Sequence, residues 1–170
     1  MEIKGPGFTL REWRTTDAQA LQKNANNGNV YAFLFDRFPH PYTMDNAIEW
    51  ISLMLNQDPF LCFVIAIDGE LAGAIGIEMR TDVYRKAPLI GYWLAEPHWG
   101  KGIMTNALKL VVDYAFANLD IKRLQAGVFS NNPRSMRVLE KCGFVKEGVS
   151  KSAIIKNGEV LDEHIYALVP

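Results

Sequence analysis

The stretch of residues 89–128 constrains the fold more than any other part of the chain. An apolar run at residues 89–94 predicts a strand, and the apolar periodicity of residues 102–119 predicts a long helix. Residues 123–128 predict a further strand directly after that helix. A strand, a crossover helix and a second strand form a β-α-β unit, which places the two strands parallel in one sheet.

Tight hairpins lie on both sides of this unit in the sequence. Asp68-Gly69 and Asn157-Gly158 each stand between two strand-like runs. Such pairs favour the two-residue turns that join antiparallel strands. The runs that they join are residues 61–67 with 71–79, and residues 145–155 with 159–168.

The rest of the chain adds a first strand at residues 8–13 and several helices. Helical periodicity is clear at residues 17–25 and after Thr43, and residues 31–42 predict a short helix followed by a loop. The helix after Thr43 is expected to bury one stripe of side chains. That stripe consists of Ala47, Ile48, Ile51, Leu55 and Trp50.

A last helix is expected at residues 133–142, ended by Gly143. The resulting order, β-α-α-β-β-β-α-β-α-β-β, predicts an α/β (α+β) fold with a mixed, mostly antiparallel sheet of about seven strands flanked by helices. No Gly/Ser/Pro linker divides the 170 residues, so we expect a single domain spanning residues 1–170.

Composition and charge narrow the class of protein. The net charge of -1 provides no basic field, so we expect neither nucleic acid nor an anionic membrane as a partner. Cys62 and Cys142 stand far apart with no cluster of ligands around them, so we expect no disulfide framework and no metal. Residues 1–7 lack the pattern of a signal peptide, which favours a cytoplasmic protein.

The turn Gly100-Lys101-Gly102 connects the strand at residues 89–94 to the long helix. Glycines let a backbone approach a ligand closely, and a helix start supplies unpaired N–H groups at the positive end of its dipole. This combination is typical of an anion site suited to a pyrophosphate.

Two familiar phosphate motifs do not fit this turn. A dinucleotide fingerprint needs a third glycine where Thr105 stands, and an acidic residue where the chain has Lys122 and Arg123. A triphosphate loop needs a glycine where Ala95 stands. The sequence therefore predicts a phosphate cradle of another kind.

The second candidate segment, residues 128–144, reads VFSNNPRSMRVLEKCGF. Asn132 precedes a proline and is a candidate helix N-cap. Ser135 falls in the first turn of the same helix. There are two alternatives. Either both side chains only cap the helix, or they also face a cleft that opens at the end of the preceding strand.

These segments together resemble the GNAT superfamily of N-acetyltransferases, and within it the RimJ/RimL-type ribosomal-protein-alanine N-acetyltransferases. The matching residues are IGYWLAEPHWGKGIMTNAL, NNPRSMRVLEKCGF, and a tail with NGE, Asp162 and Tyr166. The resemblance implies acetyl-CoA as cosubstrate, direct attack by an amine acceptor in a ternary complex, and a sheet that splays at its central parallel pair.

The resemblance also implies roles for particular residues. Pantetheine would pair with the backbone of Tyr92, Trp93 and Leu94. The pyrophosphate would bind the backbone amides of five consecutive residues, Trp99, Gly100, Lys101, Gly102 and Ile103. Asn132 would contact the cofactor arm, and Ser135 would act at the leaving thiolate. The chain departs from the pattern at Pro97, where the superfamily has Gln or Arg. It also departs at Leu139 and Glu140, where many members carry a tyrosine acid.

A carboxylate near the cleft would take the proton of the amine. Glu78 is the favoured candidate and Glu96 the weaker one, each with the alternative of a solvated or ion-paired strand end. His40 and His98 are better explained as surface residues.

The acceptor is expected to be the α-amino group of a protein N-terminus, in a monomer or homodimer. A small-molecule N-acetyltransferase acting on a polyamine, amino sugar or antibiotic, and a CoA-binding sensor without activity, remain the alternatives.

Overall fold

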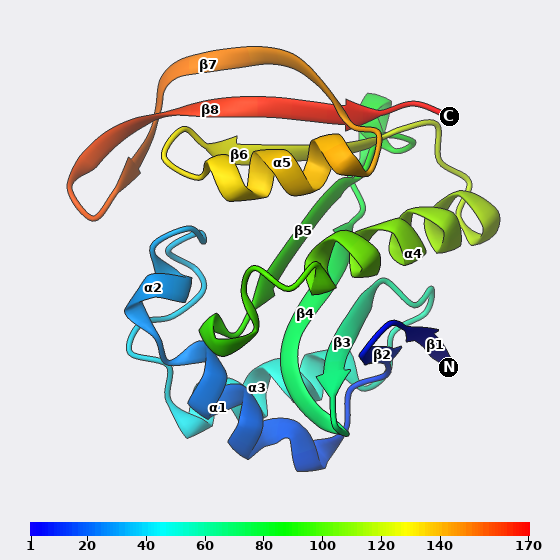
Figure 1. The fold of residues 1–170 in the computed structure, drawn as a ribbon. Coiled ribbons are helices and arrows are strands. Elements are labelled where there is room, and N and C mark those ends of the chain that lie inside the picture. The colour runs from blue at the N-terminus through cyan, green and yellow to red at the C-terminus, as the bar shows by residue number, and fades with distance from the viewer. The chain divides into compact units, whose positions relative to one another are not determined.

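The computed structural model describes residues 1–170, which divide into two compact units (Figure 1). The first unit comprises residues 1–76 and 92–107, and the second comprises residues 77–91 and 108–170. Three elements contribute to both units: β4 (Glu70–Glu78), β5 (Leu89–Leu94) and α4 (Ile103–Asn118). The expectation of a single domain stays a prediction.

The first unit contains antiparallel strands in the order β1, β2, β3, β4. Their register places Leu10 opposite Ile65 and Val64 opposite Ala74, all of them buried. The strands before β4 are β1 (Glu2–Gly5), β2 (Phe8–Arg11) and β3 (Cys62–Ile67). The predicted hairpin at Asp68-Gly69 is confirmed, with both residues at positive φ.

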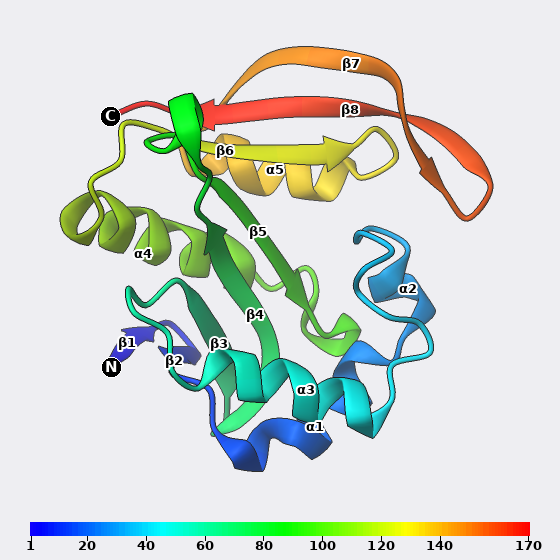
Figure 2. The same cartoon turned by 180° about the vertical axis from the view of Figure 1, so that it is seen from behind.

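Helices α1 (Ala18–Ala25) and α3 (Met44–Met54) lie side by side in the first unit (Figures 1 and 2). The 3-10 turn η1 (Thr15–Asp17) leads into α1. Thr43 caps α3 as predicted, because its side chain accepts a hydrogen bond from the N–H of Asn46. Leu21, Ala47 and Ile51 belong to the core that these helices form with β3 and β4.

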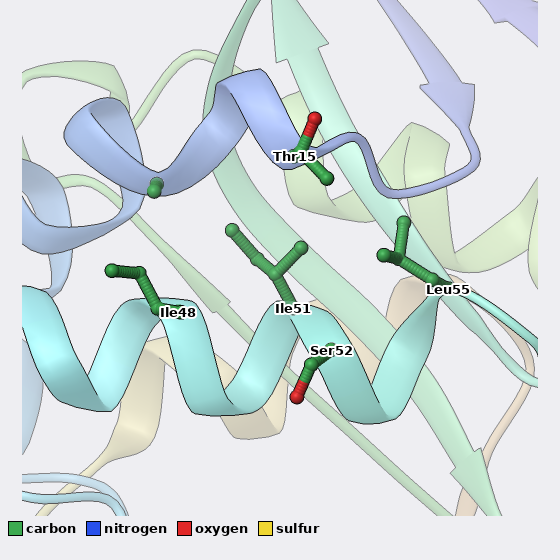
Figure 3. Close-up of a pocket in the computed structure, with 6 residues that line it drawn as sticks. Thr15, Ile48, Ile51, Ser52 and Leu55 are labelled. Atoms are coloured by element: carbon green, nitrogen blue, oxygen red, sulfur yellow. The ribbon is translucent and has the colours of Figure 1, made fainter.

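The stripe predicted for α3 is wrong at three positions. Ala47 and Ile51 are buried, but Ile48, Trp50 and Leu55 are 55%, 40% and 42% exposed. Ile48 and Leu55 line an open apolar pocket of about 220 Å³ between α3 and the η1–α1 segment, which explains the exposure of these two side chains. Figure 3 shows the side chain of Ile51 pointing from α3 across this pocket towards the segment of Thr15, whereas Ser52 points away. Periodicity shows which residues share a face, but not how much of it a neighbouring helix covers.

The short helix predicted near residue 31 begins earlier than expected. It is α2 (Gly28–Tyr31), and Asn27 is its N-cap, accepting a hydrogen bond from the N–H of Asn29. The Asn-Gly cluster therefore ends α1 and also starts α2. Tyr31 stacks on His40, with ring centroids 4.9 Å apart.

The second unit contains the start of β5, followed in sheet order by β6, β8 and β7. Their bounds are β6 (Leu124–Phe129), β7 (Val145–Lys156) and β8 (Glu159–Leu168). The strands β5 and β6 run parallel, with Leu89 opposite Gln125, and the other recorded pairs are antiparallel. This confirms the predicted mixed, mostly antiparallel sheet, with eight strands instead of about seven. The splay of the parallel pair stays a prediction.

Helix α5 (Pro133–Lys141) covers one face of β6 and β8 (Figures 1 and 2). Tyr166 of β8 is fully buried, and its hydroxyl donates a 2.9 Å hydrogen bond to Glu140 of α5. Burial and the neighbouring Glu140 carboxylate raise the pKa of Tyr166 to about 12, so the hydroxyl keeps its proton. Gly143, at φ +86°, ends the helix as predicted. No helix of the structure is long and apolar enough to span a membrane.

Candidate functional site

The loop after β5 is tied to the end of that strand in the first unit. The N–H of Ala95 donates to the carbonyl of Ala72 at 2.7 Å, and the indole N–H of Trp99 donates to the carbonyl of Leu94 at 2.7 Å. Between them lies the 3-10 turn η3 (Glu96–His98), which Pro97 favours at its first turn. The loop therefore leaves the strand in a defined direction.

Gly100 and Gly102 both have left-handed backbones, at φ +74° and +76°. Side chains other than glycine rarely adopt this conformation. A Cβ at either position would meet nothing within 4 Å, so the backbone there borders open space. The two glycines thus present bare backbone at the start of α4.

Helix α4 begins at Ile103, directly after the second glycine. The first N–H groups of a helix have no partner within it, and its N-terminus carries the positive end of the dipole. The N–H of Asn106 already bonds to the carbonyl of Gly102 at 3.1 Å. The backbone amides just before Asn106 lie at the N-terminal end of the helix, where an anion binds favourably.

The second half of β5 packs closely against β4. A Cβ on Gly73 would lie 2.4 Å from the carbonyl oxygen of Trp93 and 3.0 Å from the Cα of Leu94. The Trp93 ring packs edge-on against Phe38, with centroids 5.7 Å apart, and Tyr92 is half-buried. Because glycine has no Cβ, the backbone of Trp93 and Leu94 can lie this close to β4 at position 73.

Glu96 is held by two asparagines of the segment before and within α2. Asn27 Nδ2 donates to Glu96 Oε2 at 3.1 Å, and Asn29 Nδ2 donates to the same oxygen at 2.9 Å. Sequence reasoning missed both asparagines, because 67 or more positions separate them from Glu96. These contacts support a structural role for Glu96, which ties α2 to the loop after β5.

In the second unit, Asn132 is the N-cap of α5, as predicted. Its Oδ1 accepts a hydrogen bond from the backbone N–H of Ser135 at 3.3 Å. The Ser135 side chain is half-buried and does not serve as this cap, because the bond comes from its main chain. The structure therefore confirms Asn132 as a cap, and the role of the Ser135 hydroxyl stays a prediction.

Glu78 stands at the exposed end of β4 and belongs to the second unit, with residues 77–91. The proposed cofactor residues 92–103 belong to the first unit, whereas Glu78, Asn132 and Ser135 belong to the second. The structure thus groups the predicted residues in two sets, and their catalytic roles stay predictions.

Comparison with known proteins identifies the family. The family described as acetyltransferase (GNAT) domain matches residues 8–145. A Bacillus subtilis protein described as the probable N-acetyltransferase YjcK is 34% identical over an alignment of 174 residues, which covers 98% of this chain and 96% of that protein.

Two further relatives have named acceptors of different kinds. The ribosomal-protein-serine acetyltransferase of Escherichia coli is 32% identical over 119 residues, covering 69% of this chain and 66% of its own. The spermidine N(1)-acetyltransferase of Vibrio cholerae is 26% identical over 157 residues, covering 91% of this chain and 88% of its own.

Solved structures of the RimJ/RimL type share the fold. RimL, a ribosomal L7/L12 α-N-protein acetyltransferase solved with coenzyme A, superimposes with a TM-score of 0.87 at 24% identity, covering 99% and 98% of the two chains. RimJ of Mycobacterium smegmatis, solved with a CoA-disulfide, gives a TM-score of 0.84 at 26% identity, covering 99% and 86%. Since the family match spans most of the chain and its relatives are N-acetyltransferases, the chain belongs to the GNAT acetyltransferase family and is an acetyl-CoA-dependent N-acetyltransferase.

Proposed function

We propose that the acceptor of this enzyme is the α-amino group of a protein or peptide N-terminus. The cofactor half of the proposal depends on one observation, the two left-handed glycines with open space beside them at the start of α4. The amides of residues 99–103 bind the pyrophosphate of acetyl-CoA there, and the backbone of residues 92–94 pairs with its pantetheine arm. Lys101 is exposed beside the same amides and adds positive charge.

Acyl transfer then proceeds by direct attack. The neutral amine nitrogen bonds to the thioester carbonyl carbon, the carbon–sulfur bond breaks, and coenzyme A leaves as its thiolate. Ser135 donates a proton to that thiolate and recovers one from water, and Glu78 takes the proton of the amine, directly or through water. Asn132 contacts the cofactor arm through its Nδ2, since its Oδ1 is engaged in the helix cap.

The acceptor assignment is supported by chemistry and by relatives. An α-amino group has a pKa near 8, compared with about 10.4 for a lysine side chain, so far more of it is neutral near pH 7. A site with a weak general base is therefore sufficient to acetylate an α-amino group. The relative named ribosomal-protein-serine acetyltransferase has a protein acceptor by name, whereas the spermidine enzyme favours the small-molecule alternative.

The test compares initial rates on several acceptors at matched concentration with acetyl-CoA. A short peptide with a free N-terminus should react faster than spermidine, an aminoglycoside or the side chain of α-blocked lysine, and the N-terminally blocked peptide should not react. A preference for spermidine, or equal rates on both peptides, would overturn the acceptor assignment. Binding of acetyl-CoA without turnover on any amine would support the CoA-binding sensor instead.

A further inference from the structure

Glu163 of β8 lies directly over Gly127 of β6 in the second unit. A Cβ on Gly127 would lie 2.8 Å from Glu163 Oε2 and 3.0 Å from its Cδ. Gly127 itself is exposed, and Glu163 is half-buried. The carboxylate thus occupies the place that any other side chain at position 127 would take.

This carboxylate is on the face of the sheet that α5 does not cover. Glu163 is opposite Phe129, and Ile165 is opposite Gly127, so these side chains share one face. Tyr166 is on the other face, where its hydroxyl reaches Glu140 of α5.

The neighbouring carboxylates Asp162 and Glu147 are engaged, whereas the structure has no hydrogen bond or ion pair at the side chain of Glu163. Asp162 accepts from Lys151 Nζ at 3.2 Å and from the N–H of Ser152 at 2.8 Å. Glu147 is paired with Arg123 at 2.6 Å. A half-buried carboxylate without such a partner is suited to binding a cation from outside the chain.

Glu163 is also at the end of β6 where α5 begins. The N–H of Ser130 donates to the carbonyl of Asp162 at 2.9 Å, and the N–H of Asp162 donates to Ser130 Oγ at 3.1 Å. These two bonds fix the residue before Glu163 to Ser130, which stands two positions before the N-cap Asn132. Two groups proposed to serve the cofactor, Asn132 and Ser135, stand at the start of α5, so the face of β6 and β8 opposite α5 is the one left for an acceptor in this unit.

We propose that Glu163 binds the ammonium group of the incoming acceptor on the sheet face opposite α5, and that Gly127 keeps that place open for its carboxylate. The inference rests on the proposed function and specifies its acceptor side: the substrate arrives as a cation and is held by this carboxylate before it loses its proton. Glu163 is a binding residue in this proposal, and the proton of the amine still leaves through the base.

The chain offers variants that separate charge from position. Glu163→Gln keeps the size of the side chain and removes its charge. Gly127→Ala keeps the charge but displaces the carboxylate, and the fold should tolerate it because the atom that has to move is the end of a flexible side chain. Glu159→Gln is the matched control, since Glu159 is an exposed carboxylate of the same strand.

The experiment measures KM for a short free-N-terminus peptide and KM for acetyl-CoA in each variant. Charge-assisted hydrogen bonds are strong, so Glu163→Gln should raise the peptide KM about tenfold or more, with the acetyl-CoA KM unchanged. Gly127→Ala should raise the peptide KM as well, and Glu159→Gln should match the wild type. An unchanged peptide KM in Glu163→Gln, or an equal rise in the KM for acetyl-CoA, would show that Glu163 does not bind the acceptor.

A binding measurement keeps the inference separate from the proposed function. Calorimetry on the protein loaded with coenzyme A compares the free peptide with its N-terminally blocked form, without turnover. The free peptide should bind the wild type about tenfold more tightly than Glu163→Gln, and the blocked peptide should not distinguish the two proteins. If the wild type acetylates no peptide, the proposed acceptor is wrong. Equal binding of the free peptide by the two proteins would overturn the role of Glu163.

Discussion

Gly73 of β4 lies against the carbonyl of Trp93 in β5, so that a Cβ at position 73 would stand 2.4 Å from that oxygen. Both the oxygen and the nearby Cα of Leu94 belong to the backbone, which cannot yield as a side-chain end can. Gly73→Ala should therefore force β5 away from β4 and destabilise the fold by about 1–3 kcal/mol, as overpacked cores do.

Denaturant unfolding measures this cost. Gly91→Ala provides the matched control in β5, because a Cβ there meets nothing within 4 Å and should change stability little. The same displacement should weaken acetyl-CoA binding if the backbone of residues 92–94 pairs with pantetheine. Equal stability of the two variants would show that β4 and β5 adjust without strain.

Gly102→Glu should abolish the stabilisation that acetyl-CoA gives to the fold. Ligand at a hundred times its Kd adds roughly 2.7 kcal/mol by mass action. A glutamate at position 102 adds bulk and negative charge where the pyrophosphate is proposed to bind. Thermal unfolding with and without acetyl-CoA measures the effect.

The control for this variant is Gly7→Glu. Gly7 also has a left-handed backbone, at φ +78°, with open space around it, so its substitution costs similar strain in a different turn. The Gly7→Glu variant should be less stable than the wild type, but acetyl-CoA should still raise its unfolding temperature. A full shift in Gly102→Glu would place the pyrophosphate elsewhere.

Ser135→Ala should leave the stability of the fold and the affinity for acetyl-CoA nearly unchanged while lowering turnover about a hundredfold. Stability should persist because the N–H of residue 135, and not its hydroxyl, bonds to Asn132 Oδ1. Asn132→Ala, in contrast, removes the cap and should cost about 1 kcal/mol of stability. Unfolding curves and steady-state rates on both variants separate capping from catalysis, and unchanged turnover in Ser135→Ala would remove its hydroxyl from the mechanism.

Local patterns in the sequence predicted the parts of the site that depend on neighbouring residues. The turn at Gly100 and Gly102 before the long helix and the cap at Asn132 each involve residues within a few positions, so composition and spacing were sufficient to predict them, although not the left-handed backbones of the two glycines. The short β1 was missed because four residues with a single apolar side chain, Ile3, carry little strand signal.

Contacts between distant strands and helices could not be predicted in this way. The bonds from Asn29 to Glu96, and the positions of Glu163 over Gly127 and of Gly73 against Trp93, follow from strand register and tertiary packing. Isolated glycines in the strands were visible in the sequence and are typical of close backbone approach, but the sequence did not identify which residue fills each space. The partly open face of α3 was missed for the same reason, since burial there depends on how α1 is placed.

The last prediction distinguishes the two candidate bases by pH. Below about pH 8 an α-amine is mostly protonated, so the reaction most needs a group that takes its proton. Glu78→Gln should therefore lower the rate relative to the wild type mainly at pH 6–7, and the ratio should approach a constant, smaller value above the pKa of the amine. Glu96→Gln should instead weaken the link to Asn27 and Asn29, lowering stability with no such pH dependence. Rates on the free peptide across this pH range measure the ratio to the wild type for both variants, and unfolding curves measure the stability of Glu96→Gln. A ratio for Glu78→Gln that stays flat across pH would exclude Glu78 as the base, and a pH-dependent ratio for Glu96→Gln would assign that role to Glu96, despite the two amides that hold it.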